Sequence, residues 1–341
     1  KEQAKVPGSR FSHGLPNKGD GQMLFLSHVA SKLMPAGKNG SGGRGAVVSN
    51  GSPLFTGGPG SGPDQIRAWL LENDLVDAII QLPTNMFYGT GISTYIWILD
   101  TNKEDHRKGF VQLIDASECW SVPDKGLGDK RREMREADRT KVLETYSAFA
   151  DSDMSKVLTP DDLGFRDVKV TKQARLGVHV TDDAIGEVLE HKQAVNAHAD
   201  VVRAVANASY NDLPDALKAA AKDHGVKMPA TLIDAISKAV AVPENEAEPA
   251  VDRKGNPVLD PSFTMTERVP LTEDIDEHMQ REVLPFAPDV TWDATKAVTG
   301  YEIPFKRVFY KPEPVRPLEE IDADVSVVMG RLAEKFAGVR E

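Results

Sequence analysis

Two adjacent aromatic residues, Phe87 and Tyr88, lie in a segment whose pattern allows contact with a planar ligand. An apolar run over 76–82 ends at Pro83, and a second apolar run over 94–99 follows a short glycine-containing stretch. The runs predict two strands, with the aromatic pair on the loop between them. Aromatic rings at the mouth of a sheet can stack on a nucleobase that has left its duplex. Periodicity alone favours packing of either ring in the core, so stacking is the alternative interpretation here.

The elements around this loop predict an α/β fold, the downstream half of a doubly wound sheet. The link over 83–91 is short, so the strands on either side of it should pair antiparallel. In chain order the pattern predicts a helix over 20–34, a strand over 46–48, a helix over 64–73, and strands over 76–82, 94–99 and 110–115.

Composition divides the chain into four parts: 1–120, 121–180, 181–315 and 316–341. The first is the sheet, the second a mixed connector, the third a mainly helical extension, and the fourth a terminal helix. A Pro/Glu-rich linker near 243–261 is expected to be mobile. Shorter predicted elements are helices over 141–149 and 274–283 and strand-like segments over 167–180 and 301–310. The terminal helix carries one apolar stripe, made of Leu318, Ile321, Val325, Val328, Leu332 and Phe336.

Bulk composition is that of a soluble globular protein, with 40% hydrophobic and 27% charged residues. No apolar run approaches the roughly 20 residues that cross a bilayer, so we expect no membrane association and a cytoplasmic location. The single cysteine, Cys119, excludes an intramolecular disulfide, and we expect it to be a small, semi-buried apolar residue rather than a nucleophile. The net charge of −11 suggests that another chain supplies much of any DNA affinity.

The histidines and the basic residues give weaker indications of function. The eight histidines lack metal-ligand spacing, so no metal site is expected. The basic run that contains Lys130, Arg131 and Arg132 could contact DNA phosphate. A solvated face balanced by nearby acidic residues is the favoured interpretation, the acids being Glu133, Glu136 and Asp138.

Several long segments, in order, resemble the methylation subunit of type I restriction–modification systems, a DNA adenine-N6 methyltransferase. They are 20–35, 44–103 (which includes LPTNMFYGTGISTYIWIL), 110–120 (FVQLIDASECW) and 300–325. The resemblance covers most of the chain, most loosely over 186–260. It implies the downstream half of a Rossmann-like methyltransferase sheet, in which the last strand inserts antiparallel, followed by a mainly helical C-terminal extension.

The resemblance implies methyl transfer from S-adenosylmethionine to adenine N6 in double-stranded DNA. Phe87 would then stack on the flipped adenine, with Tyr88 as the adjacent alternative and Thr94 near the pocket. Ser49 and Asn50 end a strand at its carboxyl edge, where they either line the site or simply form the turn. On the first helix Phe25 would be adjacent to the cofactor, although packing in the core is favoured for this ring.

Two parts of that machinery are missing from the sequence. The family's tetrapeptide, (Asn or Asp)-Pro-Pro-aromatic, does not occur, because Asn256-Pro257 is followed by valine. The Gly-rich stretch 57–62 lies downstream of the position of the family's cofactor loop and is interpreted as a surface loop. We therefore expect no catalytic residue in this chain, a start inside a longer gene product, and no activity of the chain alone. An unpaired strand edge should make it dimeric, aggregated or partly disordered.

The implied partners are a specificity subunit, a second methylation subunit, a restriction subunit and double-stranded DNA. The terminal stripe would serve as a partner contact, although docking on its own domain is equally allowed. The rival hypothesis is a non-catalytic assembly module that docks on a specificity subunit. An RNA methyltransferase is a weaker third, because it should carry a basic RNA-binding appendage that the sequence lacks.

Overall fold

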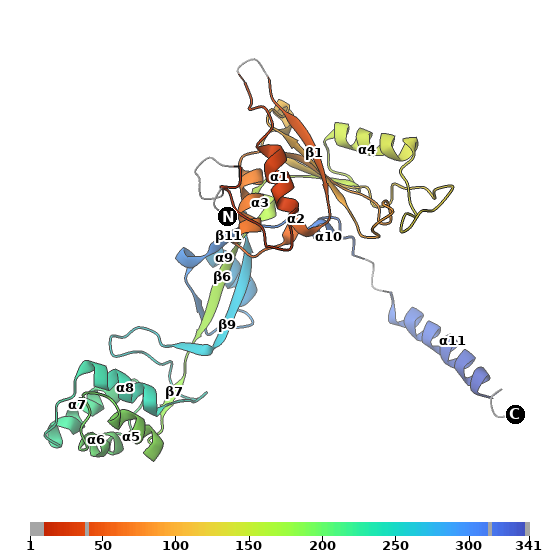
Figure 1. Cartoon of the computed structure of the whole chain (residues 1–341). Coiled ribbons are helices and arrows are strands. Elements are labelled where there is room, and N and C mark those ends of the chain that lie inside the picture. The colour runs from red at the N-terminus through yellow and green to blue at the C-terminus, as the bar shows by residue number, and fades with distance from the viewer. Residues whose placement is uncertain (1–9, 38–40, 313–315, 338–341) are drawn as a thin grey trace.

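A five-stranded sheet organises the N-terminal part of the chain (Figure 1). The structure is a computed structural model that describes residues 10–37, 41–312 and 316–337. In the strand order β1-β3-β2-β4-β5, β3 runs antiparallel to both neighbours, whereas β2 and β4 are parallel. The predicted antiparallel pairing across the aromatic loop is thus confirmed. The strands are β1 (Arg44–Ser49), β2 (Val76–Gln81), β3 (Tyr95–Asp100), β4 (Val111–Asp115) and the unpredicted β5 (Ser155–Leu158).

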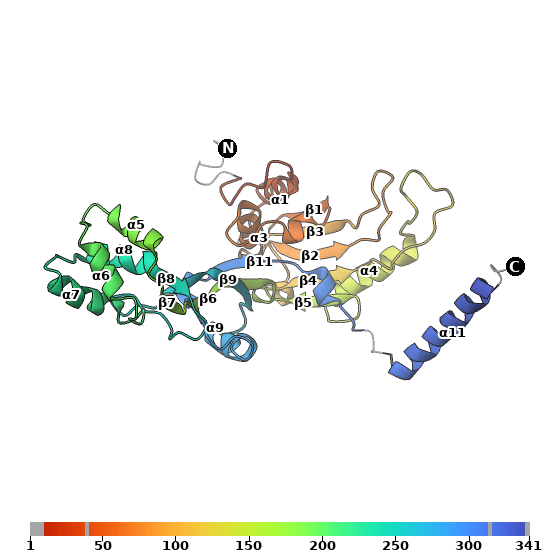
Figure 2. The ribbon, with the colours of Figure 1, turned by 90° about the horizontal axis from the view of Figure 1, so that it is seen from below.

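Helices cover both faces of this sheet (Figures 1 and 2). One face carries α1 (Gln22–Ala30), α2 (Ser52–Phe55) and α3 (Gly62–Glu72), and the other carries α4 (Glu136–Ala148). Side chains alternate between the two layers, as the period of a strand requires. In β3, Trp97 and Leu99 pack in the first layer, and Ile96 and Ile98 pack in the second. The predicted α/β architecture follows from this alternation.

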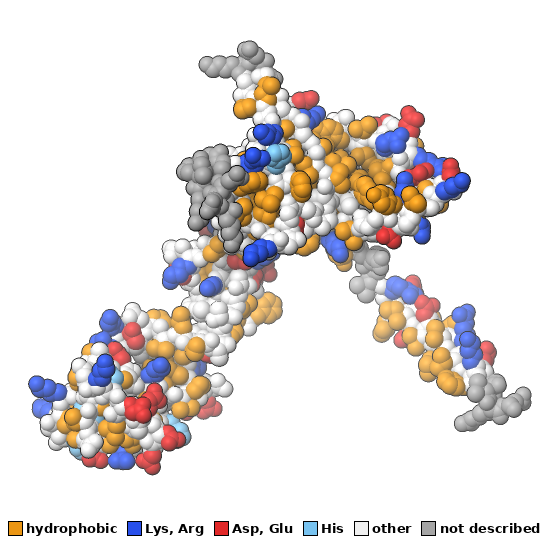
Figure 3. Space-filling model, in the orientation of Figure 1, with side chains coloured by type: hydrophobic (Ala, Val, Ile, Leu, Met, Phe, Trp, Pro, Cys, Tyr) orange, Lys and Arg blue, Asp and Glu red, His pale blue; other side chains and the backbone are white. Residues whose placement is uncertain are grey.

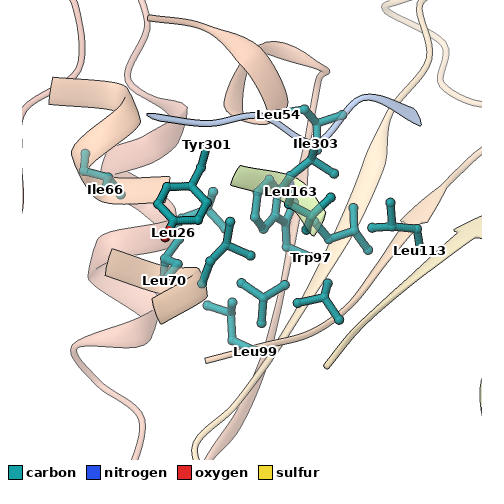
Figure 4. Packing of buried hydrophobic residues seen from close by; sticks show 14 of the residues in the cluster. Leu26, Leu54, Ile66, Leu70, Trp97, Leu99, Leu113, Leu163, Tyr301 and Ile303 are labelled. Carbon is teal, nitrogen blue, oxygen red and sulfur yellow. The ribbon is translucent and has the colours of Figure 1, made fainter. Parts of the chain in front are cut away.

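The larger core brings distant parts of the chain together (Figure 4). Trp97 is fully buried at its centre, beside Leu26 from α1 and Leu70 from α3. Tyr301 and Ile303, which lie more than two hundred residues later in the sequence, pack into the same cluster. The C-terminal part is therefore an integral half of this core.

A buried ion pair fixes that attachment. The guanidinium of Arg67 donates to the carbonyl oxygen of Tyr301, and the Asp64 carboxylate accepts from the N–H of Tyr301 at 2.8 Å. Arg67 also donates to the Pro53 carbonyl oxygen at 3.0 Å and lies 3.3 Å from Asp64. A buried charge pair is tolerated only when its remaining donors and acceptors are satisfied, and here the backbone satisfies them.

On the opposite face a second buried carboxylate, Asp77 of β2, anchors α4. It accepts from Arg107 Nε at 2.7 Å and from the hydroxyl of Tyr146, a residue of α4. Burial and the hydrogen bond to Asp77 raise the pKa of Tyr146 to about 12. The phenol therefore stays protonated and donates at physiological pH.

The rest of the chain forms a second sheet and a helical unit (Figure 1). β6 (Gly164–Gln173) is the shared strand of the second sheet, paired antiparallel with β9 (Leu259–Pro270), β10 (Val290–Trp292) and β11 (Val298–Tyr301). α9 (Ile275–His278) continues into a π-helix (Met279–Val283), and both pack on the second sheet. The short strands β7 (Leu176–Val178) and β8 (Ala241–Pro243) lead to a helical core of α5 (Asp182–Leu189), α6 (His198–Ala204), α7 (Leu213–Asp223) and α8 (Ala230–Val240).

The strand predicted over 301–310 is wrong beyond its first residue. β11 ends at Tyr301, and the short helix α10 (Phe305–Val308) follows. Phe305 and Phe309 lie one helical turn apart, and their rings stack with centroids 5.8 Å apart. Aromatic residues at that spacing suit one face of a helix as well as a strand, and tertiary packing selected the helix.

The segment over 243–261, predicted to be a mobile linker, is tied back to its surroundings by backbone hydrogen bonds. The N–H of Ala250 donates to the carbonyl oxygen of Ala174 at 2.7 Å, and that of Val258 donates to Ala250 at 2.9 Å. Ala250 is fully buried. Mobility of this segment stays a prediction.

The predicted terminal helix is confirmed as α11 (Leu318–Ala337), and the last residues of the predicted span lie outside the described part. α11 stands apart from the rest of the molecule in both ribbon views (Figures 1 and 2). Every residue of its apolar stripe is exposed, and hydrophobic side chains follow the helix in Figure 3. Within the described residues, no helix combines the length and apolar character needed to cross a membrane.

β1 is an edge strand, because within the described residues β3 is its sole hydrogen-bonded neighbour. Hydrophobic side chains gather around it and α1 on the face shown in Figure 3, with Val48 55% exposed. An apolar edge with unpaired backbone groups templates pairing with another chain.

We expect the isolated chain to self-associate through this edge, and Val48→Lys to reduce the association because a charge blunts edge pairing. Light scattering over a range of concentrations measures it. Val195→Lys is the matched control, since Val195 is 54% exposed but lies in the helical unit. A monodisperse monomer of the unmodified chain would contradict the prediction.

Candidate functional site

Strand register brings the predicted pocket residues to one end of the sheet. Ser49 at the end of β1 lies opposite Tyr95, the first residue of β3. Gln81 at the end of β2 pairs with both Tyr95 and Asp115, the last residue of β4. The carboxyl ends of three strands therefore meet, and open α/β sheets bind ligands at that edge.

Ser49 and Asn50 form the turn that leaves this edge. Ser49 is buried, and its hydroxyl accepts from Trp97 Nε1 at 3.2 Å and donates to the Asn50 carbonyl oxygen at 2.8 Å. Asn50 Oδ1 accepts from the N–H of Ser52 at 2.8 Å, which starts α2. The turn-forming role is confirmed, and the pocket-lining role stays a prediction.

Thr94 precedes β3 at the same edge and is buried. Its carbonyl oxygen accepts from the N–H of Leu82 at 2.8 Å, which closes the base of the loop between β2 and β3. Its hydroxyl has no hydrogen-bond partner among the described residues. Buried hydroxyls are usually paired, so Thr94 offers an unused donor at the candidate site.

The aromatic loop, residues 83–91, projects its rings from this edge. Tyr88 is 73% exposed and Phe87 is 39% exposed, so core packing is wrong for Tyr88 and incomplete for Phe87. A backbone bridge between Phe87 and Thr90 makes the tip a tight turn. Within the described residues neither ring stacks on another ring or cation. The exposed ring of Tyr88 and the partly exposed ring of Phe87 could therefore contact a planar ligand.

Two more aromatic rings, on α1 and α2, are exposed. Phe25 is 66% exposed, so the favoured core packing of this ring is wrong; Met23 and Leu26 form the buried side of α1 instead. Sequence reasoning missed Phe55, which is also exposed, because a four-residue helix gives no periodic signal. A side chain at Gly51 would meet the rings of both Phe55 and Tyr95, which places Phe55 beside the start of β3.

The basic loop, residues 125–132, lies against the aromatic loop. Arg132 donates to Thr84 Oγ1 at 3.0 Å, and its guanidinium lies 4.2 Å from the centroid of the Trp120 ring. Sequence reasoning missed this pairing because the two segments are 35 residues or more apart in the chain.

The acidic residues thought to balance the basic loop do not pair with it. Glu133 contacts Arg135 at 2.9 Å, and Asp138 accepts from the N–H of Arg135 at 2.9 Å at the start of α4. Among the described residues, no carboxylate forms an ion pair with Lys130, Arg131 or Arg132. Direct ion pairing therefore does not neutralise these side chains, and the interpretation of a solvated face balanced by nearby acidic residues stays a prediction.

The Gly-rich stretch 57–62 is a packed surface loop that leads into α3. The N–H of Gly60 donates to the Asp64 carboxylate at 2.8 Å, and that of Ser61 donates to the Gly58 carbonyl oxygen at 3.0 Å. A Cβ at Gly62 would lie 1.9 Å from the Leu15 carbonyl oxygen. The amides of Gly60 and Ser61 are therefore already hydrogen-bonded.

An open sheet with one antiparallel strand between parallel neighbours, and with exposed aromatic residues at its carboxyl edge, defines an α/β fold of the methyltransferase class. The chain belongs to the N-6 DNA methylase family, whose model matches residues 1–183. That match includes all five strands of the first sheet and both loops of the candidate site.

The similar curated proteins are methylase subunits of type I restriction enzymes, which confirms the resemblance seen in the sequence. The HindI methylase subunit of Haemophilus influenzae is 31% identical over 144 residues, 42% of this chain and 29% of the relative. The MjaIX methylase subunit of Methanocaldococcus jannaschii is 24% identical over 180 residues, 50% of this chain and 30% of the relative. The matched region thus spans under a third of each relative's length.

Among solved structures, the type I restriction-modification methyltransferase subunit of Streptococcus thermophilus is 30% identical to this chain. The superposition covers 46% of this chain and 30% of that one, with a TM-score of 0.38.

Cys119 is buried in the cluster between the sheet and α4, as a small apolar residue. Burial raises the pKa of its thiol; Lys141 opposes this effect, and the acidic residues Asp138, Asp115 and Glu118 add to it. A thiol held in the neutral form is a poor nucleophile. Packing of Cys119 as a small apolar residue is confirmed, and its low reactivity stays a prediction.

We therefore expect Cys119 to resist iodoacetamide in the folded protein at pH 7.5 and to react fully in denaturant. Mass spectrometry of the alkylated chain measures the difference. Rapid stoichiometric alkylation without denaturant would show an exposed or activated thiol and contradict the packing between the sheet and α4.

Proposed function

We propose that this chain is part of a type I methylation subunit that transfers a methyl group from S-adenosylmethionine to adenine N6 in double-stranded DNA. The observation that carries the proposal is the exposed aromatic loop at the carboxyl edge of a sheet in a chain of the N-6 DNA methylase family. The relatives' identity as type I methylase subunits supports the same reaction.

The aromatic loop is the part of the site that this chain supplies. An adenine extruded from the duplex loses its stacking neighbours, and a protein ring replaces them. We assign Phe87 to stacking on the base, because its partly buried ring is held more firmly than that of Tyr88. Base–aromatic stacking contributes on the order of 1–3 kcal/mol. Tyr88 then lies at the pocket rim, and Thr94 adds a hydroxyl donor below it.

We propose that this chain does not hold S-adenosylmethionine by itself. The amides of residues 60 and 61 are already bonded within the Gly-rich loop, and the sequence lacks the tetrapeptide whose side chain and carbonyl would orient the amine. Phe25 is the exposed ring that could lie beside the cofactor. The cofactor, when bound, would supply an electrophilic methyl group on sulfur. Here this chain contributes base stacking and one wall of the site.

Assembly with other subunits forms part of the proposal. The exposed stripe of α11 suits a helix of a specificity subunit, which would read DNA sequence, and a second methylation subunit and a restriction subunit would complete the complex. The net charge of −11 supports dependence on a partner for DNA affinity. We place the complex in the cytoplasm with its DNA.

A second candidate function is a non-catalytic assembly module. The Gly-rich loop and the exposed apolar stripe of α11 favour an assembly module, because neither feature indicates a bound cofactor. The two functions differ in their dependence on the aromatic loop, because an assembly module has no use for Phe87.

Phe87→Ala in the complete methylation subunit, assembled with its specificity subunit, should lower the rate of methyl transfer about 5- to 150-fold, the loss of one stacking interaction. Transfer of a tritiated methyl group from S-adenosylmethionine to target DNA measures it. Phe87→Trp should retain most activity, and Tyr88→Ala should have the smaller effect. Phe286→Ala is the control, an exposed ring outside the candidate site. Full activity of Phe87→Ala would favour the assembly module.

A further inference from the structure

The basic loop and the aromatic loop are joined as one unit by main-chain hydrogen bonds. The carbonyl oxygen of Asn85 accepts from the N–H groups of Arg131 at 2.9 Å and Arg132 at 3.1 Å. The carbonyl oxygen of Tyr88 accepts from the N–H of Asp129 at 3.0 Å. The Asn85 side chain completes the set, because its Nδ2 donates to the Asp129 carbonyl oxygen at 3.1 Å.

The close approach depends on backbone conformations that few residues adopt. Asn85 has φ of +56°, in the left-handed region that asparagine tolerates better than most side chains. Gly128 also has φ of +56°, and a Cβ there would lie 2.4 Å from the Tyr88 carbonyl oxygen. The aromatic loop is therefore shaped by its contact with the basic loop.

The joined unit presents positive charge beside exposed rings. Among the described residues, the ammonium groups of Lys125 and Lys130 have no carboxylate in ion-pair contact, and Arg131 bonds carbonyl oxygens of its own loop. Leu127 is 67% exposed between them. In a chain of net charge −11, a loop with four basic side chains and one acidic side chain, Asp129, is a local exception. Clustered lysine and arginine side chains of this kind suit phosphate groups.

We propose that the basic loop binds the phosphate backbone of duplex DNA next to the base that the aromatic loop receives, and that Asn85 is the positioning residue that fixes one loop against the other. This inference rests on the proposed function. It adds a backbone contact contributed by the methylation subunit itself. The contact would hold the strand while the base is extruded, and would carry no sequence information.

The charge contribution is tested by Lys125→Gln with Lys130→Gln in the complete subunit assembled with its specificity subunit. Among the described residues neither ammonium forms an ion pair, so the fold should be unaffected. Each phosphate contact contributes about 0.9 to the slope of log K against log salt, so the double variant should lower that slope by roughly 1.8. Lys192→Gln with Lys222→Gln, exposed lysines of the helical unit, should leave it unchanged.

The positioning role is tested by Asn85→Ala and Asn85→Gly, read out with 2-aminopurine at the target adenine, which fluoresces when unstacked. Glycine adopts the left-handed conformation without strain and keeps the carbonyl acceptor, whereas alanine strains it. We expect Asn85→Ala to lose most of the fluorescence rise and Asn85→Gly to retain at least half of it. An Ala variant that behaves like the unmodified protein, or a Gly variant as impaired as Ala, would overturn the role.

The two levels of the hypothesis fail differently. If the unmodified complex neither methylates its DNA nor raises the 2-aminopurine signal, the proposed function fails. If it does both, and the double lysine variant keeps the unmodified salt slope, then the inference about the basic loop alone is overturned.

Discussion

A buried arginine joins α3 of the first sheet to the distant backbone of Tyr301. Arg67 and Asp64 both lie on α3: Arg67 donates to the carbonyl oxygen of Tyr301, and Asp64 accepts from its N–H. Both backbone groups of this one residue are therefore hydrogen-bonded to α3. Removing one partner would leave an uncompensated charge in the core, which costs about 3–5 kcal/mol. These hydrogen bonds hold Tyr301 and Ile303 in the core around Trp97. The helices that position the carboxyl edge of the sheet consequently depend on residues far downstream.

The candidate site follows from one topological feature, the antiparallel insertion of β3. Since β3 enters the sheet at the edge where β2 ends, the connection between them must turn at the carboxyl end, and it places Phe87 and Tyr88 there. A parallel pair would instead need a crossover connection of a dozen or more residues. The basic loop packs on this turn through backbone hydrogen bonds to Asn85. The site is therefore built from the first sheet and from the connector, residues 121–180.

The sequence predicted what depends on local periodicity and on resemblance. The apolar runs over 76–82 and 94–99 predicted two strands, the short link between them predicted their antiparallel pairing, and the stripe from Leu318 to Phe336 predicted α11. The pattern misled where tertiary contacts decide. Phe25 has helical spacing with core residues yet faces outward, and Phe305 lies on a helix within a segment that was predicted to be strand-like. Pairing of the two loops could not be read from sequence, because it rests on main-chain bonds that carry no residue signature.

The central claim is that this chain supplies the base-stacking half of a methyltransferase site and depends on other sequence for its cofactor. Calorimetric titration of S-adenosylmethionine into this chain, beside the complete methylation subunit, tests it most directly. The account predicts micromolar binding by the complete subunit and no binding heat with this chain. Micromolar binding by this chain alone would contradict the account, and would direct attention to the Gly-rich loop over 57–62 as the cofactor site.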